Sequence, residues 1–332
     1  MTRRLIACGW TPETERLLNL LRARAGMEAV AVADDRPVAL ANAAVATDLP
    51  RYQHTIEAVR RIEQDVVLID GTEDASNLIE AAAVRGSTIL LRGDVADAEA
   101  LDAAAEAANA RGVALFLLRP LLRSAGLAFF SAQLGERRWR PHYVSLEIEG
   151  ERSALALLRD GFAAYARLLP AAPLALAASH AGMRSAPEVI SAHLRLPEGG
   201  MATITARRGP WSTLRIRALA AAGSAELDAT AEHTTLTIAP DDGPIESTRL
   251  RHGDLLGAEV DHIVASPRGD ALDALLAPRE AALLRAVEQA LTGDLAQAVE
   301  DRALRPALRV LQGGDQPSAA SVPQPRFTLL SS

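Results

Sequence analysis

The sequence contains no lysine, because all 35 of its basic residues are arginine. Arginine stays protonated throughout the physiological pH range, so it cannot serve as a neutral amine base or form a Schiff base. Any mechanism that needs such an amine must draw on a group other than a lysine side chain.

Cysteine and aromatic residues are also scarce. Cys8 is the only cysteine, so the chain forms no intramolecular disulfide, which is typical of a reducing compartment. Aromatic residues make up 3% of the chain, and the core must be built mainly from Ala, Leu and Val. The N-terminal apolar stretch is too short for a signal peptide, and no later run is long enough to cross a bilayer. We expect a soluble cytoplasmic protein without a membrane partner.

The formal charge of −7 argues against general nucleic-acid binding, which needs a basic face to displace counterions. One short basic run stands out: Arg137, Arg138 and Arg140 surround Trp139. Two interpretations of this run remain open, a solvated loop and a phosphate site.

Signatures of metal binding and hydrolysis are missing. The sequence has no Gly-x-Ser-x-Gly elbow and no Walker sequence. No metal site is predicted, because the seven histidines show no paired ligand spacing: they are His54, His142, His180, His193, His233, His252 and His262.

The first third of the chain alternates between strand and helix signals. Arg4–Cys8 is an apolar run that ends at Gly9, which suits a buried parallel strand. Thr11-Pro12-Glu13 then has the features of a helix start, with a hydroxyl cap, proline in the first turn and an acid. Gly26 ends that helix, and Glu28–Ala33 is the next strand.

The same rhythm continues to residue 120. Further strands are predicted at 65–69, 87–91 and 113–118, with helices near 74–84 and 96–110. Strands and helices that alternate at this spacing form a parallel sheet with right-handed crossovers. Residues 1–120 are therefore predicted to be a Rossmann domain with a doubly wound sheet.

In such a sheet the ligand lies beyond the carboxyl ends of the strands. The segments that topology gathers there are Gly9–Pro12, Asp34–Arg36, Asp70–Glu73, Arg92–Asp94 and Arg119.

From His142 onward a period of two dominates, which predicts an open, mostly antiparallel sheet. After the strand that begins there, strands are predicted at 201–207, 214–219, 225–229 and 234–238, with helices at 153–169, 278–291 and 295–311. Residues 121–312 are thus expected to form an α+β domain. The tail 313–332 is rich in Gly, Pro, Ser and Gln and is expected to be irregular.

The order of these elements, with five local segments, resembles the glucose–fructose oxidoreductase/inositol dehydrogenase (Gfo/Idh/MocA) family. The segments are AVAVADD, EAAAVRGSTILL, FLLRPLLRSAGLAFFSAQLGE, LRIRALAAAGSAELDAT and EDRALRPALRVLQ. The resemblance covers almost the whole chain. It implies NAD or NADP as cofactor and a sugar, cyclitol or related hydroxy compound as substrate.

The resemblance also implies a cofactor site. Asp34 falls where the family places an acid that binds the adenosine ribose and favours NAD, and Arg36 could accept the 2′-phosphate of NADP. The family's glycine-rich turn is altered, since Pro12 replaces its last glycine. Dinucleotide binding and a vestigial turn therefore both remain open, as does a plain polar turn at residues 34–37. The cofactor-binding candidates are Gly9, Trp10, Thr11, Asp34, Arg36, Gly71 and Arg92.

The catalytic motifs depart further from the family pattern. Where the family has Glu-Lys-Pro, this chain has Arg92-Gly93-Asp94, and Ala75 takes the position of the histidine after the third strand. In the family's Asp-x-x-x-His motif Asp160 is present, but the histidine position is Ala164, with Tyr165 next to it. Asp160 and Tyr165 are the remaining acid–base candidates, and a packing role for Tyr165 is the alternative.

Arg119 and Arg123 follow the fifth major strand and resemble the arginine-bearing loop of the family's substrate pocket. A clamp for a substrate carboxylate or phosphate and a structural salt bridge are the two interpretations.

Two functions follow from these observations. The first is an NAD(P)-linked oxidoreductase that works without lysine. The second is a non-catalytic homologue that binds a ligand or a catalytically competent relative, in which the cofactor has been lost. In both cases a homo-oligomer through the exposed face of the second domain's sheet is expected.

Overall fold

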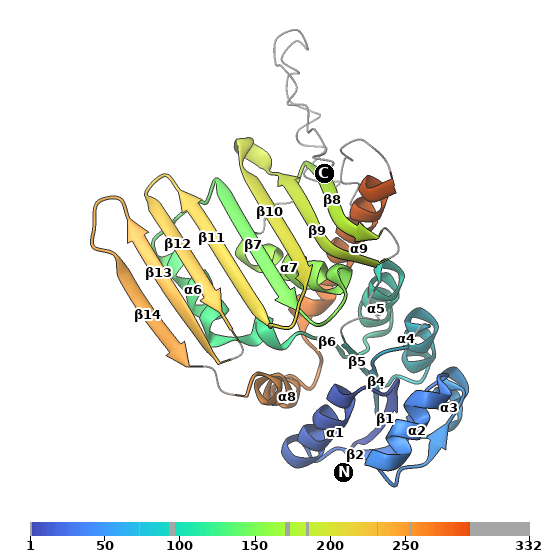
Figure 1. Ribbon diagram of the computed structural model, residues 1–332. Coiled ribbons are helices and arrows are strands. Elements are labelled where there is room, and N and C mark those ends of the chain that lie inside the picture. The colour runs from blue at the N-terminus through green and yellow to red at the C-terminus, as the bar shows by residue number, and fades with distance from the viewer. Residues whose placement is uncertain are drawn as a thin grey trace. The chain divides into compact units, whose positions relative to one another are not determined.

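The computed structural model describes residues 2–72, 74–92, 97–169, 173–183, 186–230, 232–251 and 254–292. The chain divides into two compact units (Figure 1). The first contains Met1–Ala128 and Leu250–Ala281, and the second contains Phe129–Arg249 and the chain from Ala282 onward. This division differs from the expected boundary after residue 120, because 250–281 returns to the first unit.

The first unit is a parallel sheet of six strands in the order β3-β2-β1-β4-β5-β6. The strands are β1 (Arg4–Cys8), β2 (Glu28–Ala33), β3 (Arg51–Tyr52), β4 (Val66–Ile69), β5 (Thr88–Arg92) and β6 (Leu115–Leu118). The connecting helices are α1 (Pro12–Ala25), α2 (Pro37–Ala46), α3 (Thr55–Arg61), α4 (Ala75–Val84) and α5 (Ala98–Arg111). This is the Rossmann order, and the predicted doubly wound parallel sheet is confirmed.

The first helix begins and ends as its sequence predicts. The Thr11 hydroxyl accepts a hydrogen bond from the Thr14 amide at 3.1 Å, and Pro12 is the first helical residue. Gly26 follows the helix with φ of 59°, a left-handed conformation that costs glycine little.

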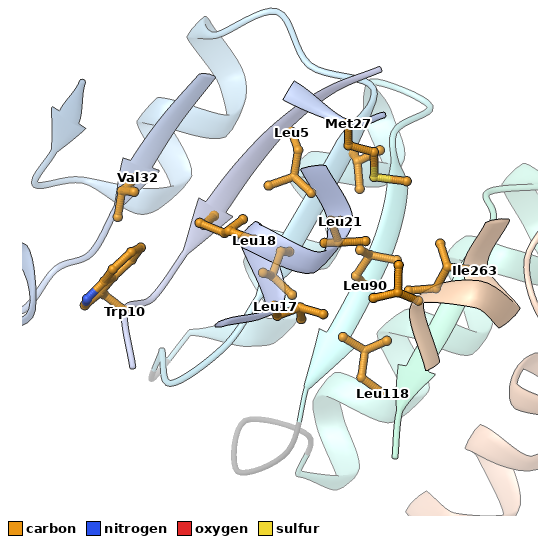
Figure 2. Packing of buried hydrophobic residues seen from close by; sticks show 14 of the residues in the cluster. Leu5, Trp10, Leu17, Leu18, Leu21, Met27, Val32, Leu90, Leu118 and Ile263 are labelled. Carbon is orange, nitrogen blue, oxygen red and sulfur yellow. The ribbon is translucent and has the colours of Figure 1, made fainter. Parts of the chain in front are cut away.

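The core on the α1 side of this sheet is built from aliphatic side chains (Figure 2). Leu17 and Leu21 of α1 are buried in one cluster with Leu90 of β5. Val260 and Ile263 belong to the same cluster and come from α8 (Leu255–Ala265). Full burial of each such side chain contributes about 1.5–3 kcal/mol. These contacts explain why the segment after residue 250 packs with the first unit.

The second unit contains a sheet of eight strands in the order β14-β13-β12-β11-β7-β10-β9-β8. The strands are β7 (Tyr143–Gly150), β8 (Ala175–Met183), β9 (Ala186–Arg195), β10 (Met201–Arg208), β11 (Thr213–Ala220), β12 (Gly223–Ala229), β13 (His233–Pro240) and β14 (Glu246–Arg251). Neighbours are antiparallel from β8 to β10 and again from β7 to β13, whereas β7 and β10 run parallel. The open, mostly antiparallel sheet expected here is confirmed.

One face of this sheet is covered by α7 (Ala154–Leu168) (Figure 1). Gly161 allows the close approach, because a Cβ there would lie 2.5 Å from Ile204 Cγ2. The other face is charged. Arg217 of β11 pairs with Glu226 of β12 at 2.8 Å, and next to them Arg215 pairs with Asp228 at 3.5 Å. All four side chains are exposed. The alternation of buried and exposed residues along these strands therefore follows the pattern read from the sequence.

The long helix α9 (Ala271–Thr292) begins earlier than expected. The prediction that it starts at Pro278 is wrong, since Pro278 lies inside the helix. The Asp270 carboxylate accepts hydrogen bonds from the amides of Leu272, at 2.8 Å, and Asp273, at 3.4 Å, so it caps the true start. The expected helix at 295–311 and the tail 313–332 lie outside the described residues.

Candidate functional site

The turn from β1 into α1 lies at the carboxyl edge of the first sheet. Gly9 has φ of 89°, and a Cβ at this position would lie 1.4 Å from the carbonyl oxygen of Asp70. Only glycine allows the two loops to approach so closely. The next amide, Trp10 N–H, donates to Asp34 Oδ2 at 2.7 Å, and the indole of Trp10 is buried in the core beside Val32 (Figure 2).

Asp34 follows β2 and is buried, with 1% of its surface exposed. Arg36 holds both carboxylate oxygens: its Nη2 donates to Oδ2 at 2.7 Å, and its Nε and backbone N–H donate to Oδ1 at 2.9 and 2.8 Å. The carboxylate that the resemblance assigns to ribose is thus bound by its own neighbour in the chain. Charge-assisted, bidentate pairs of this kind are stronger than hydrogen bonds between neutral groups.

Asp70 follows β4 and lies beneath the start of α1. Its Oδ2 accepts hydrogen bonds from the hydroxyls of Thr11, at 2.9 Å, and Thr14, at 2.7 Å. A helix N-terminus favours a negative charge, and here the chain itself provides that charge.

Arg92 ends β5 and faces the same edge. Its guanidinium forms an ion pair with Glu13 of α1 and lies 3.7 Å from Asp70. Gly71 leaves room for the Arg36 guanidinium, since a Cβ at Gly71 would lie 3.2 Å from Arg36 Nη2. The structure therefore gathers all seven of the predicted cofactor-binding residues at one edge, linked through Asp34 and Asp70.

A pocket of about 840 Å³ opens beside the Asp34–Arg36 turn. Its wall also includes α3, where Thr55 Oγ1 donates to Asp35 Oδ2 at 2.6 Å and fastens the helix to the turn. Arg60 and Arg61 of α3 line the pocket, and Arg61 is paired there with Glu57. The remaining lining residues are His54, Ile56, Glu57, Thr72 and Asp74.

Arg119 and Arg123, the expected substrate arginines, are both in ion pairs within the first unit. Arg119 is 2% exposed and binds Glu280 with two hydrogen bonds, one of 2.8 Å from Nη1 to Oε1. Arg123 Nη2 donates to Asp270 Oδ2 at 2.6 Å and lies 3.3 Å from Asp273 Oδ2. These contacts correspond to the salt-bridge interpretation of the two residues.

The pKa values of the two carboxylates next to Arg123, Asp270 and Asp273, are shifted in opposite directions. Burial alone would raise the pKa of Asp270, but the hydrogen bond and charge of Arg123 outweigh it and hold this pKa below its usual value. Burial raises the pKa of Asp273, and the charge of Asp270 adds to the rise against the opposing charges of Arg119 and Arg123.

Asp160 and Tyr165, the acid–base candidates, lie on α7 in the second unit. Asp160 is 2% exposed, forms an ion pair with Arg152, and has Arg159 Nη2 3.7 Å from Oδ1. Tyr165 is 1% exposed and is among the largest fully buried side chains. Arg152, which is partly exposed, connects Asp160 with the surface of the helix.

The sequence did not indicate two residues of α1 that bind the expected cofactor residues and their neighbours: Glu13, which pairs with Arg92, and Thr14, which donates to Asp70. Glu13 served only as a first-turn acid, and the hydroxyl at position 14 carried no signal of its own. The capping-box spacing of Thr11 and Thr14 was the available clue, since each side chain bonds the other's backbone amide.

Three further points concern the residues that the structure describes. Gly93 and Asp94, where the resemblance places the family's lysine and proline, lie outside them. Within them, no group of three or more His, Cys, Asp or Glu side chains is placed to hold a metal ion. No helix in the same residues has the length and apolarity needed to cross a membrane.

Neither a family model nor a curated protein matches the sequence. Solved structures do match the fold. A 3-ketoreductase from Actinomadura kijaniata, in complex with TDP-benzene and NADP, has a TM-score of 0.74 at 17% identity, over 87% of this chain and 98% of its own.

Two further structures agree with this result. The UDP-N-acetylglucosamine 3-dehydrogenase from Acidithiobacillus ferrooxidans has a TM-score of 0.70 at 19% identity, over 87% of this chain and 98% of its own. An oxidoreductase from Agrobacterium radiobacter in complex with NAD+, L-tartaric acid and magnesium has 0.72 at 12%, over 90% and 99%. At such identities the likeness shows the fold, and the fold implied by the Gfo/Idh/MocA resemblance is confirmed.

Proposed function

We propose that the chain is an NAD(P)-linked oxidoreductase of a sugar, cyclitol or related hydroxy compound. The observation that carries the proposal is the pocket of about 840 Å³ beside Asp34 and Arg36, at the end of β2. This fold places a dinucleotide at the carboxyl edge of the parallel sheet. Three solved structures with the same fold are oxidoreductases or dehydrogenases, and two of them contain NADP or NAD+.

The residues fit the adenosine half of such a cofactor. We propose that Asp34 binds the ribose hydroxyls once Arg36 releases it, and that Arg36 and Arg60 supply positive charge for a 2′-phosphate; Arg61 is paired with Glu57. When bound, the nicotinamide ring supplies or accepts the hydride. The chain's own part is to hold the adenosine and to move a proton at the substrate oxygen.

Where the diphosphate of the cofactor would bind, at the turn from β1 into α1, the protein's own side chains occupy the backbone amides. The amides of Trp10, Thr11 and Thr14 already donate to side-chain oxygens, and Pro12 has no amide hydrogen. Asp70 adds a carboxylate beneath the helix start. A diphosphate could enter only after these groups exchange partners.

For proton transfer we propose Asp160, with Tyr165 as the alternative. Asp160 leads because it falls on the aspartate of the family's Asp-x-x-x-His motif, whereas Tyr165 lies one residue beyond the histidine position. We expect Asp160→Asn to lower kcat at least a hundredfold without changing cofactor affinity, a loss typical of an acid–base group.

Titration with NADH and NADPH, followed by nicotinamide fluorescence, tests the proposal. Asp34→Asn should weaken binding of NADH about tenfold, since one charge-assisted hydrogen bond is lost. Arg22→Gln, an exposed arginine of α1, is the matched control and should change nothing. If neither cofactor gives a response at millimolar concentration, the proposal fails.

A second candidate, a non-catalytic homologue, is favoured by one specific observation. The charged groups of the expected site bind one another, Asp34 with Arg36, Arg92 with Glu13 and Asp160 with Arg152, in a chain without lysine. Such a protein would bind a ligand or a competent relative. Turnover of any member of a polyol panel with added NAD or NADP would remove this candidate.

Under either proposed function, we expect two copies of the chain to associate through the exposed face of the second unit's sheet. The ladder of Arg215, Arg217, Glu226 and Asp228 would make that contact polar. Light scattering at high concentration that shows only a monomer would contradict it.

A further inference from the structure

A second pocket lies wholly within the second unit. It has a volume of about 770 Å³, and every residue that lines it falls between 131 and 200. The wall combines the end of α6 (Ala125–Glu136), the segment before β7, the end of α7 and the turn between β9 and β10. None of the expected catalytic, cofactor-binding or substrate-binding residues belongs to it, but Arg138 and Arg140 of the basic run do.

The lining has an apolar part and a basic part. Leucines form the apolar part, and they are Leu134, Leu168, Leu169 and Leu196. Arg138, Arg140 and His142 form the basic part, against the single carboxylate of Glu198. In the described part of the chain, neither Arg138 nor Arg140 has an ion-pair or hydrogen-bond partner for its guanidinium. Their neighbour Arg137, in contrast, is paired with Glu246 at 2.7 Å.

Trp139 also lines the pocket and is packed between Arg137 and β12. The guanidinium carbon of Arg137 lies 5.8 Å from the centre of the indole, as in a cation–π contact. On β12, a Cβ at Gly223 would lie 2.9 Å from Trp139 Cη2, so the absence of a side chain there makes room for the ring. The indole in the middle of the basic run is therefore packed against the protein.

The backbone at this pocket is unusual. Among the described residues, Arg138, with φ of 53°, and Glu198, with φ of 63°, are the non-glycine residues with positive φ, and both line the pocket. Arg138 follows α6 in the position where a glycine normally ends a helix: its amide donates to the Gly135 carbonyl, and the Trp139 amide to that of Leu134, each at 3.0 Å. Residues held in such conformations cluster at functional sites.

We propose that this pocket binds an amphipathic organic anion, with an aliphatic or aromatic body and one carboxylate or phosphate head. The leucines and Trp139 accept the body, and Arg138 and Arg140 bind the head. Guanidinium groups suit both heads, because they donate two parallel hydrogen bonds. Leu168 is eight residues beyond Asp160 on α7, about 12 Å along the helix, so the pocket is separate from the proposed catalytic carboxylate.

Isothermal titration calorimetry with octanoate and octyl phosphate tests the proposal on the full chain, with octylamine and octanol as charge controls. Both anions should bind at least tenfold more tightly than octanol, and octylamine should not bind. The stronger of the two anions identifies the head as carboxylate or phosphate. Equal binding of all four compounds, or no binding of either anion at millimolar concentration, would overturn the proposal.

Variants locate the site. The double variant Arg138→Gln, Arg140→Gln should weaken binding of the anions at least tenfold, and Arg207→Gln, at an exposed arginine of β10, is the control. Gly135→Leu adds a side chain at the pocket wall, where a Cβ would meet no atom within 4 Å, so it should block binding without disturbing the fold. Unchanged affinity in both pocket variants would place the bound anion elsewhere and refute the assignment.

Discussion

Replacing Glu280 by glutamine removes the charge that faces Arg119. Both side chains are almost fully enclosed, at 1% and 2% exposure. Removing one partner of a buried ion pair costs about 3–5 kcal/mol. A protein of this kind has about 5–15 kcal/mol of unfolding free energy, so the loss is a large part of the total.

Urea unfolding at pH 7, followed by far-UV circular dichroism, measures this loss. With a urea dependence of about 2 kcal/mol per molar, the midpoint should fall by about 2 M. Glu57→Gln is the matched control, since Glu57 pairs with Arg61 on the surface of α3, and it should change the unfolding free energy by less than about 1 kcal/mol.

A double replacement separates the two roles of Arg119. Arg119→Met with Glu280→Met removes both charges, and it should restore much of the stability lost in Glu280→Gln. If Glu280→Gln unfolds within 1 kcal/mol of the parent protein, Arg119 is not held by this pair. The salt-bridge interpretation would then be refuted, and a substrate clamp would regain support.

Three further outcomes are expected. Arg138→Gly should raise the unfolding free energy by about 1 kcal/mol in a urea titration, because glycine adopts positive φ without strain. The same variant should weaken octanoate binding, because it removes a guanidinium. A loss of stability would show that the backbone of Arg138 is not strained. Burial lowers the pKa of His193, so protonation favours the unfolded chain and Tm should fall as pH drops below about 6.5, whereas His193→Gln should flatten this dependence. Burial raises the pKa of the Cys8 thiol, with the charges of Asp35 and Asp34 adding to the effect, so a thiol reagent should modify Cys8 only after urea unfolds the first unit.

Local signals predicted the first unit well. Thr11, Pro12 and Gly26 fixed the limits of α1, because caps depend on residues within one turn of the helix. Pro278 misled, because proline is common in the first turn of a helix, whereas this one lies inside a helix that starts after the Asp270 cap.

The partners of the site residues could not be predicted in the same way. Arg119 and Glu280 are separated by 161 residues, and Arg123 and Asp270 by 147, so no local pattern links them. The positive φ of Arg138 was equally hidden, since the sequence has arginine where glycine would announce the turn. Topology could gather the ends of the strands, but only packing decides which charged groups neutralise one another.

The pair formed by Asp34 and Arg36 predicts which cofactor binds better. A ribose hydroxyl would have to displace Arg36 from Asp34, exchanging charge-assisted hydrogen bonds for weaker ones. A 2′-phosphate would attract Arg36, and Arg60 lines the same pocket, whereas Arg61 is paired with Glu57. NADPH therefore has an electrostatic advantage that NADH lacks.

We therefore expect NADPH to bind at least tenfold more tightly than NADH, with a difference that shrinks as salt is raised. Arg36→Gln should invert this preference, because it removes a phosphate ligand and releases Asp34 for the ribose. Fluorescence titrations of both cofactors at two salt concentrations measure the ratio. A preference for NADH that survives in Arg36→Gln and does not depend on salt would show that Asp34 binds ribose in spite of Arg36, and the electrostatic reasoning would then be wrong.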